Sequence, residues 1–226
     1  MKTIYIILAS LLLISCASEN EKKGLDEVAE LYNATASYSK GISSTVGKKT
    51  IKRFNIKLSD SKLLDSLPIT ESAANIALTV FKNFDKKEKN NYTELHVEFI
   101  NSKNDTLAYS FPVRLLQRLL PKIKAYTIFS ESIMSGDFER IDNYKNSDYI
   151  GVSVVESLKK YTTELTERYG DIVDYQPYGL VEVKDGKKSL ARFLGFFNFS
   201  NGKQVAYSVT VDMPKGKEKI AGYRIF

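Results

Sequence analysis

Apolar residues recur with two different periods in the first half of the chain. A period of about 3.6 residues predicts helices over 25–39 and 70–84, and strict alternation predicts a strand at 54–58 between them. A second alternating stretch, 92–111, predicts a hairpin closed by the loop 101–105. These patterns predict three strands in one antiparallel sheet, with helices on its apolar face. Residues 43–49 are predicted to form a loop, and residues 85–89 a charged turn. A short helix is predicted between them, with Ser59 and Asp60 as its cap and Pro68 at its end. Thr70 is the predicted N-cap of the helix that follows.

The third quarter of the chain has helical patterns separated by sharp stop signals. Gly136 and Gly170 are placed where helices are expected to end, because glycine adopts the left-handed conformation of a helix C-terminus without strain. The spacing of Ser153 and Glu156 predicts a capping box at the start of the last helix. The other predicted boundaries are Pro112 in a first turn, Pro121 at a kink, and Asp137 at an N-cap.

The last quarter of the chain is predicted to be a four-stranded antiparallel meander. Asp185-Gly186 and Asn201-Gly202 are strong hairpin signals between alternating stretches. Residues 190–199 are apolar on both faces, which indicates a central strand, and Gly195 in its middle indicates a bend or bulge. The whole chain is therefore predicted to be an α+β protein.

The N-terminus has the layout of a secretory signal. Lys2 precedes an apolar run at 4–14 that is too short for a stable membrane span, and Cys16, the only cysteine, follows it. Leu13-Ile14-Ser15-Cys16 resembles the lipobox of bacterial lipoproteins. The resemblance implies cleavage before Cys16, acylation of Cys16, and a lipid anchor in the cell envelope; Ala17 after the cysteine implies sorting to the outer membrane. The alternative is a secreted protein without a lipid.

Four segments follow from these patterns. Residues 1–15 are the signal peptide, and 16–24 are the lipidated cysteine with a polar, flexible tether that holds the body off the membrane. Residues 25–111 form a small α+β domain of unknown role, and 112–226 form a second α+β domain. The alternative is one fused unit, in which the segment 112–121 would resist proteolysis.

The second domain has a recognisable order of elements. Its cues are Ser135 to Phe138 opening a short helix, Arg168-Tyr169-Gly170 ending a long one, and the closing segment Lys219 to Tyr223. Helices followed by a bent four-stranded meander resemble the cone-shaped fold of nuclear transport factor 2-like and cystatin-like proteins. This resemblance implies a fold that hosts enzymes, binding domains and assembly domains alike, so it implies no particular activity.

Composition excludes several functional classes. The 33 Lys and Arg against 27 Asp and Glu give a net charge of +6, but the basic residues are dispersed in pairs such as Lys86-Lys87 and Lys159-Lys160. A nucleic-acid surface would be a clustered stripe, so we expect no nucleic-acid partner. The glycines stand singly and no zinc-ligand spacing occurs, so we expect no cofactor and no metal.

His96 is the only histidine and shares a strand face with Glu94 and Glu98. Alternate residues of a strand are about 7 Å apart, so three such ligands do not reach one ion unless the strand bends. A solvated face is the expected interpretation.

Few residues suit catalysis. Enzymes of the cone fold often hold a carboxylate or a tyrosine inside the cone, where burial raises a carboxyl pKa. Tyr207 is placed on the apolar face, whereas Asp212 is predicted to point outward. A nucleophile, base and orienting group do not come together, so we assign no catalytic residue. The candidates weighed are Asp174, Tyr175, Glu182, Tyr207 and Asp212.

The aromatic content, 14 Tyr and 12 Phe, is the remaining functional signal. We predict a binding or assembly module whose partner is an envelope protein or an apolar ligand, with a small acid–base enzyme as the alternative. The predicted ligand-binding residues are Tyr175, Phe193, Phe197 and Tyr207, and the predicted partner-contact residues are Tyr144, Tyr149, Tyr175 and Tyr178.

Overall fold

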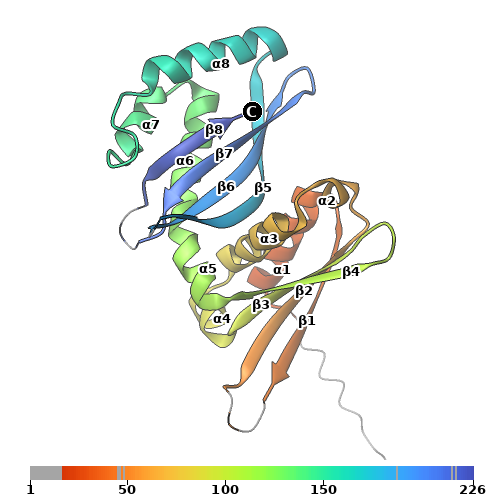
Figure 1. The fold of residues 1–226 in the computed structure, drawn as a ribbon. Coiled ribbons are helices and arrows are strands. Elements are labelled where there is room, and N and C mark those ends of the chain that lie inside the picture. Colours follow the sequence, from red (N-terminus) through yellow and green to blue (C-terminus); the bar gives the residue numbers. More distant parts are fainter. Residues whose placement is uncertain (1–16, 45–46, 48, 187, 215, 217) are drawn as a thin grey trace, which may run out of the picture.

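The computed structural model describes residues 17–44, 47, 49–186, 188–214, 216 and 218–226. These residues form an α+β fold with one four-stranded sheet in each half of the chain (Figure 1). The signal peptide predicted over 1–15 and the lipidation site predicted at Cys16 lie outside the described residues.

The first half builds a four-stranded sheet against two long helices. Its elements are α1 (Glu19–Tyr32), β1 (Thr35–Ser43), β2 (Ile51–Ser59), α2 (Lys62–Ser66), α3 (Ile69–Asn83), α4 (Lys86–Asn91), β3 (Glu94–Ile100) and β4 (Thr106–Pro112). The strand at 54–58 and the hairpin with the loop 101–105 are confirmed. Phe54, Ile56 and Leu58 of this strand share a buried face.

The N-terminal sheet differs from the prediction in two ways. It is mixed rather than antiparallel, because β2 and β3 are joined through three helices and lie parallel. It also has a fourth strand, β1, where the sequence predicted the end of a helix and a loop. Asn33, in the left-handed conformation with φ of 46°, ends α1 early and frees the following residues to pair with β2.

The polar tether predicted before residue 25 is also wrong as a structural prediction, because α1 begins at Glu19. Ser18 and Glu21 form a capping box, in which each side chain accepts a hydrogen bond from the other residue's main-chain N–H. The spacing of Ser18 and Glu21 in the sequence is that of a capping box and indicates a helix that starts here.

Several helix starts are also corrected. The charged turn predicted at 85–89 is the start of α4, because Asp85 and Glu88 form a second capping box. The box predicted at Ser153 and Glu156 does not form. There, Val154 occupies the N-cap position, and Asp142 Oδ1 accepts its N–H at 2.8 Å. The structure also places the N-cap of α2 at Ser61 and that of α3 at Pro68, instead of the predicted Ser59, Asp60 and Thr70.

The second half confirms the predicted order of helices followed by an antiparallel meander. Its elements are α5 (Val113–Leu119), the 3-10 turn η1 (Leu120–Lys122), α6 (Ile123–Ser135), α7 (Phe138–Tyr144), α8 (Val155–Tyr169), β5 (Ile172–Asp185), β6 (Lys188–Phe199), β7 (Gln204–Asp212) and β8 (Ile220–Ile225). The strand order is β5-β6-β7-β8 with every pair antiparallel. Gly136 and Gly170 end α6 and α8 with positive φ, as expected.

Gly195 is required by close packing rather than by a bulge in its own strand. The irregularity lies opposite it, in β5, between Pro177 and Gly179. A Cβ atom at Gly195 would stand 2.3 Å from the hydroxyl of Tyr126 and 2.8 Å from the ring of Tyr207. The absent side chain therefore makes room for two aromatic residues on the covered face of the sheet.

The two halves share one hydrophobic core. Buried residues from Leu25 to Ile220 form a single cluster, and Leu116 and Leu119 of the linking helix α5 belong to it. The helices α1 and α3 of the first half pack against β5 at the edge of the second sheet (Figure 1). The line where they meet contains the candidate site.

Candidate functional site

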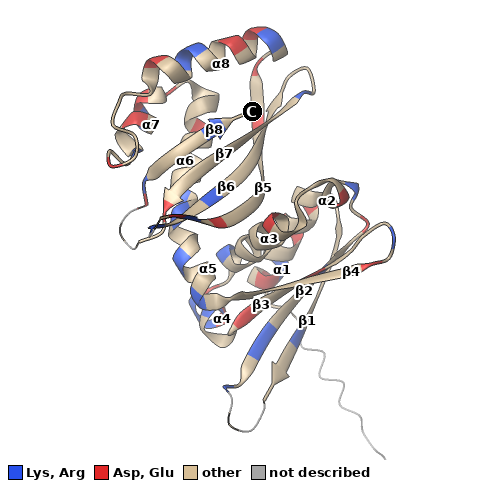
Figure 2. Ribbon diagram, in the orientation of Figure 1, with Lys and Arg blue, Asp and Glu red and all other residues tan. Residues whose placement is uncertain are grey.

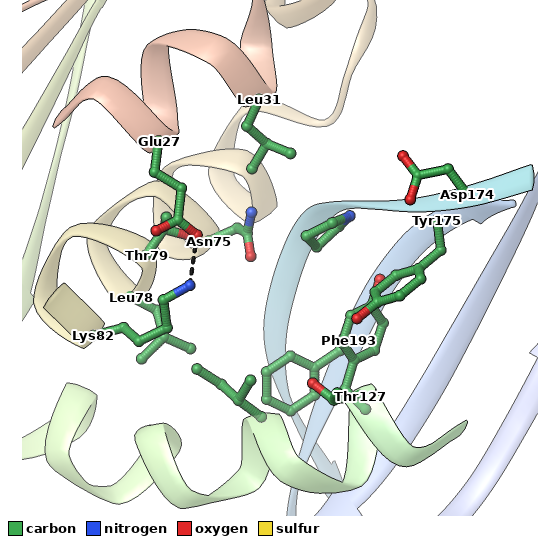
Figure 3. Close-up of a pocket in the computed structure, with 13 residues that line it drawn as sticks. Glu27, Leu31, Asn75, Leu78, Thr79, Lys82, Thr127, Asp174, Tyr175 and Phe193 are labelled. Atoms are coloured by element: carbon green, nitrogen blue, oxygen red, sulfur yellow. Dashed lines mark hydrogen bonds and ion pairs between the residues drawn. The ribbon is translucent and has the colours of Figure 1, made fainter. Parts of the chain in front are cut away.

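A cleft of about 370 Å³ opens between the two halves. In Figure 3, side chains of α1 and α3 lie on one side of it, β5 lies on the other, and α6 forms the floor. A volume of this order is typical of sites for small molecules. The described lining residues are Glu27, Leu31, Asn75, Leu78, Thr79, Lys82, Ile123, Tyr126, Thr127, Asp174, Tyr175, Pro177 and Phe193.

On the helical side, Lys82 is already neutralised by the protein. Its ammonium donates to the carboxylate of Glu27, and Asn83 Nδ2 donates to the same carboxylate at 2.8 Å (Figure 3). Lys82 is the one basic residue among the described lining residues. It is therefore poorly placed to serve as a free counter-ion for an anionic ligand.

Asn75 presents an acceptor to the cleft. The residue is 5% exposed, and its Nδ2 donates at 2.8 Å to the hydroxyl of Tyr32, which donates in turn to the main-chain carbonyl of Tyr178 at 3.0 Å. Among the described residues, none donates to Asn75 Oδ1. Because the Asn75 amide is fixed in place and its oxygen is open, it can accept a hydrogen bond from an N–H or O–H group of a ligand.

Three aromatic rings, Tyr126 of α6, Tyr175 of β5 and Phe193 of β6, form a wall that joins the floor of the cleft to its strand side. Tyr126 stacks on Phe193 with centroids 5.6 Å apart, and Tyr175 meets Tyr126 edge to face at 6.0 Å. Burial raises the pKa of the Tyr175 hydroxyl, and the negative charges of Glu131 and Asp174 raise it further. Tyr175 therefore stays neutral and lies in a negative local potential.

Asp174 places a carboxylate at the rim of this wall. It precedes Tyr175 on β5, is exposed, and lies across the opening from the helical side that carries Glu27 (Figure 3). The described lining residues thus hold two carboxylates against one ammonium, so the cleft carries a net negative charge although the whole chain is basic. Local charge of this kind selects ligands by sign.

The four predicted ligand-binding residues fall into two groups. Tyr175 and Phe193 line the cleft, whereas Phe197 and Tyr207 lie behind the wall and are fully buried. The rings of Phe197 and Tyr207 stack at 3.9 Å, and the Tyr207 hydroxyl bonds to Tyr126 at 2.7 Å and to Ser130 at 2.6 Å. These two residues support the wall, and ligand contact by any of the four stays a prediction.

The carboxylates weighed for catalysis are dispersed. Glu182 is exposed and bonded to Ser189. Asp212, predicted to point outward, is instead 5% exposed, because the loop after α7 covers it and supplies Asn146 Nδ2 at 3.0 Å and the Tyr149 hydroxyl at 3.2 Å. Among the described residues, the Tyr207 hydroxyl bonds only to the hydroxyls of Tyr126 and Ser130, so no acid–base pair forms there.

His96 lies on the solvent side of the N-terminal sheet. Nδ1 is 2.8 Å from Ser110 Oγ, and Nε2 is 3.4 Å from Glu98. Within the described part of the chain, no three His, Cys, Asp or Glu side chains gather as a metal would need.

The four tyrosines predicted to contact a partner are all half-buried. Tyr175 and Tyr178 lie on β5, with Tyr178 stacked on Phe196 at 4.4 Å. Tyr144 ends α7, and Tyr149 follows it under the ammonium of Lys188 at 4.1 Å. They do not form one surface, and a partner role for them stays a prediction.

Sequence reasoning missed the helical side of the cleft, namely Glu27, Asn75 and Lys82. Their only local signal is spacing, since Asn75, Thr79 and Lys82 recur at helical intervals on one helix. Nothing local indicates that this face meets β5, about a hundred residues later in the chain.

Comparisons with known proteins add little. No family model matches the chain, and no curated protein matches it. A solved structure of Bd1075 from Bdellovibrio bacteriovorus is similar over 53% of this chain and 45% of its own, with 11% sequence identity and a TM-score of 0.34. The similar region thus spans less than half of that protein, and a likeness this remote indicates neither family nor function.

No helix among the described residues has the length and apolar character of a membrane span.

Proposed function

We propose that the protein is a lipid-anchored binding protein of the bacterial cell envelope, which takes a small organic amine with an apolar body into the cleft between its two halves. The observation that carries the ligand proposal is the cleft itself, in which an aromatic wall is bordered by two open acceptors, Asn75 Oδ1 on the helical side and the Asp174 carboxylate at the rim of the wall. The lipobox-like segment Leu13 to Cys16 supports the anchor, and Ala17 supports sorting to the outer membrane.

Two features of the cleft favour an amine. Apart from hydroxyl groups, which both donate and accept, the open polar groups of the lining are acceptors, namely Asn75 Oδ1 and the Asp174 carboxylate, while Lys82 is held by Glu27. Tyr175 is the one residue of the aromatic wall that is partly exposed. Ammonium groups are attracted to the faces of aromatic rings. Leu31 and Leu78 on the helical side and Ile123 on the floor supply apolar surface for the rest of the ligand.

The anchor is tested by mass spectrometry of the mature N-terminus extracted from membranes. We expect a peptide that begins at an acylated Cys16, and release of the Cys16→Ala variant from the membrane fraction. An unmodified thiol, or a leader peptide still attached, would contradict the anchor.

The ligand class is tested with three probes of matched shape: phenethylamine, 2-phenylethanol and phenylacetate. Isothermal titration calorimetry should rank them in that order, with the amine about fivefold tighter than the alcohol. Asp174→Asn should weaken the amine about three- to fivefold and leave the alcohol unchanged, as expected for a rim charge. Asp171→Asn removes an exposed carboxylate three residues away, outside the lining set, and should change neither.

Equal affinity for all three probes would contradict the amine class while leaving a binding cleft in place. Failure of every probe, together with failure of a broader set of small aromatic and aliphatic compounds, would contradict the binding function itself.

A further inference from the structure

The chain emerges directly from the packed body, one residue after the predicted lipidation site. Ala17 is 7% exposed, and its main-chain N–H donates to the hydroxyl of Tyr38 on β1. The hydroxyl of Ser18 donates to Glu88 on α4, and α1 begins at the next residue. The packed fold therefore begins at Ala17, with no linker between it and residue 16.

Glu21 fastens this end of α1 to its surroundings. Its side chain is 2% exposed and accepts hydrogen bonds from the Tyr92 hydroxyl at 2.6 Å and from Ser18 N at 2.8 Å, and it pairs with Lys40 Nζ at 2.8 Å. Lys40 comes from β1 and Tyr92 from the end of α4, whereas Ser18 is the N-cap of α1 itself. A buried carboxylate with three partners is costly to separate, so the chain start is held firmly.

We propose that this end of the N-terminal sheet lies against the phospholipid headgroups and fixes the orientation of the protein on the membrane. The inference rests on the lipid anchor of the proposed function, because acyl chains on Cys16 would begin one residue from Ala17. We call the surface around this point the basal face. Its exposed residues are Lys22, Lys23, Lys40, Ile42, Lys52, Lys86 and Lys87.

Several residues of the basal face lie on the elements that Ala17, Ser18 and Glu21 contact. Lys40 contacts Glu21, and Lys52 lies beside Thr93, whose N–H donates to the Lys52 carbonyl at 2.8 Å. Lys86 and Lys87 belong to α4, the helix that Ser18 contacts through Glu88. Figure 2 shows Lys and Arg on α4 and on the neighbouring parts of β1 and β2.

The charge of the basal face suits anionic headgroups. The sequence from 40 to 53 holds no acidic residue. At α4, Lys86, Lys87 and Lys89 outnumber the carboxylates of Glu88 and of the N-cap Asp85, and Lys86 and Lys87 are exposed. Lysines beside an anionic leaflet are attracted to it over about a Debye length.

Ile42 adds an apolar contact. It is 75% exposed near the free end of the β1–β2 hairpin, paired with Lys52 across the ladder. An exposed aliphatic side chain among lysines is suited to the boundary between headgroups and acyl chains. The long helix α8, with the exposed pair Lys159 and Lys160, lies at the other end of the molecule (Figure 1).

Energy transfer from the protein to a labelled lipid tests this orientation. The mature lipoprotein carries a single engineered thiol, Lys87→Cys or Lys160→Cys, labelled with a donor dye. It is reconstituted into vesicles of phosphatidylcholine and phosphatidylglycerol that contain an acceptor lipid. We expect several-fold higher transfer from position 87 than from position 160. Equal transfer from the two positions would overturn the proposal.

Two matched variants separate the causes. A Gly-Ser linker of about 20 residues after Cys16, with a root-mean-square reach of about 25 Å, should reduce the difference between the two positions. The double change Lys86→Gln and Lys87→Gln, with the dye at Lys23→Cys, should lower transfer only in vesicles that contain phosphatidylglycerol. The control, Lys159→Gln with Lys160→Gln, should have no effect. An equal response to both double changes would overturn the basal face as the contact. Loss of all vesicle association in the unmutated lipoprotein would instead overturn the anchor, and with it this proposal.

Discussion

The hydroxyl of Tyr32 donates to the main-chain carbonyl of Tyr178, which lies 146 positions later in the chain, at 3.0 Å. Tyr32 is fully buried at the end of α1, and its hydroxyl accepts from Asn75 on α3. One phenol therefore ties both helices of the first half to the edge strand of the second sheet, next to the cleft.

Tyr32→Phe should destabilise the protein by about 1–3 kcal/mol, because Asn75 Nδ2 loses a buried partner and the Tyr178 carbonyl loses a partly buried one. Urea unfolding measures the change. Tyr161→Phe is the control, since that ring is half-buried on α8, and the expected change is within about 0.5 kcal/mol. Equal, small effects of the two substitutions would show that the Tyr32 link contributes nothing.

The shared core predicts that the two halves behave as one unit. Leu116 and Leu119 of α5 are buried between them, although Arg114 and Arg118 on the same helix are exposed to trypsin. We expect native protein to resist cleavage at these two arginines, since a protease needs a locally unfolded segment. Two stable fragments that meet within 112–121 and separate on gel filtration would support independent domains instead.

Gly195→Ala should cost about 1–3 kcal/mol of stability, because the new methyl group would overlap the Tyr126 hydroxyl and the Tyr207 ring. Gly222→Ala, also within a strand, meets nothing closer than Thr210 Cβ at 3.9 Å and should be nearly neutral. Thermal unfolding of both variants distinguishes the two environments. A neutral Gly195→Ala would mean that the aromatic wall is loosely packed.

Glu21 should make the stability depend on pH. Burial opposes ionisation of its carboxyl group, but hydrogen bonds from Lys40, Tyr92 and the Ser18 N–H outweigh burial and lower the pKa below its usual 4.5. A lowered folded-state pKa stabilises the fold above the unfolded-state value, and the contribution disappears as the pH falls through the folded-state value.

The free energy of unfolding of Glu21→Gln should therefore be well below that of the unmutated protein at pH 7, and the gap should narrow as the pH falls below about 4.5. Glu30→Gln removes an exposed carboxylate of the same helix and should leave a small, constant gap. Denaturant titrations across this range measure both. A gap for Glu21→Gln that widens toward acid pH would contradict the assigned network.

Local patterns in the sequence predict the elements whose cause is local. The alternation at 92–111, the hairpin signals of the meander and the terminators Gly136 and Gly170 all involve neighbouring residues, and each is confirmed. The strand β1 (Thr35–Ser43) was not predicted, because its many small and polar residues leave no clear alternation of apolar and polar positions. Its position is decided by pairing with β2, which is a tertiary effect.

The spacing of two residues does not by itself predict whether a capping box forms. Ser18 with Glu21, Asp85 with Glu88, and Ser153 with Glu156 share one spacing, but only the first two boxes form. At the third, Asp142 accepts the Val154 N–H, so a contact from another helix replaces the local cap. The cleft could not be predicted from local patterns either, because its two sides come from opposite halves of the chain.

The central claim, that the cleft binds a small organic amine, is tested most directly by methyl-labelled NMR during a phenethylamine titration. The account predicts saturable shifts of the methyl signals of Leu31, Leu78 and Ile123, and unchanged signals for the exposed Val152 before α8. Shifts that do not saturate, or that map to a different part of the molecule, would contradict it.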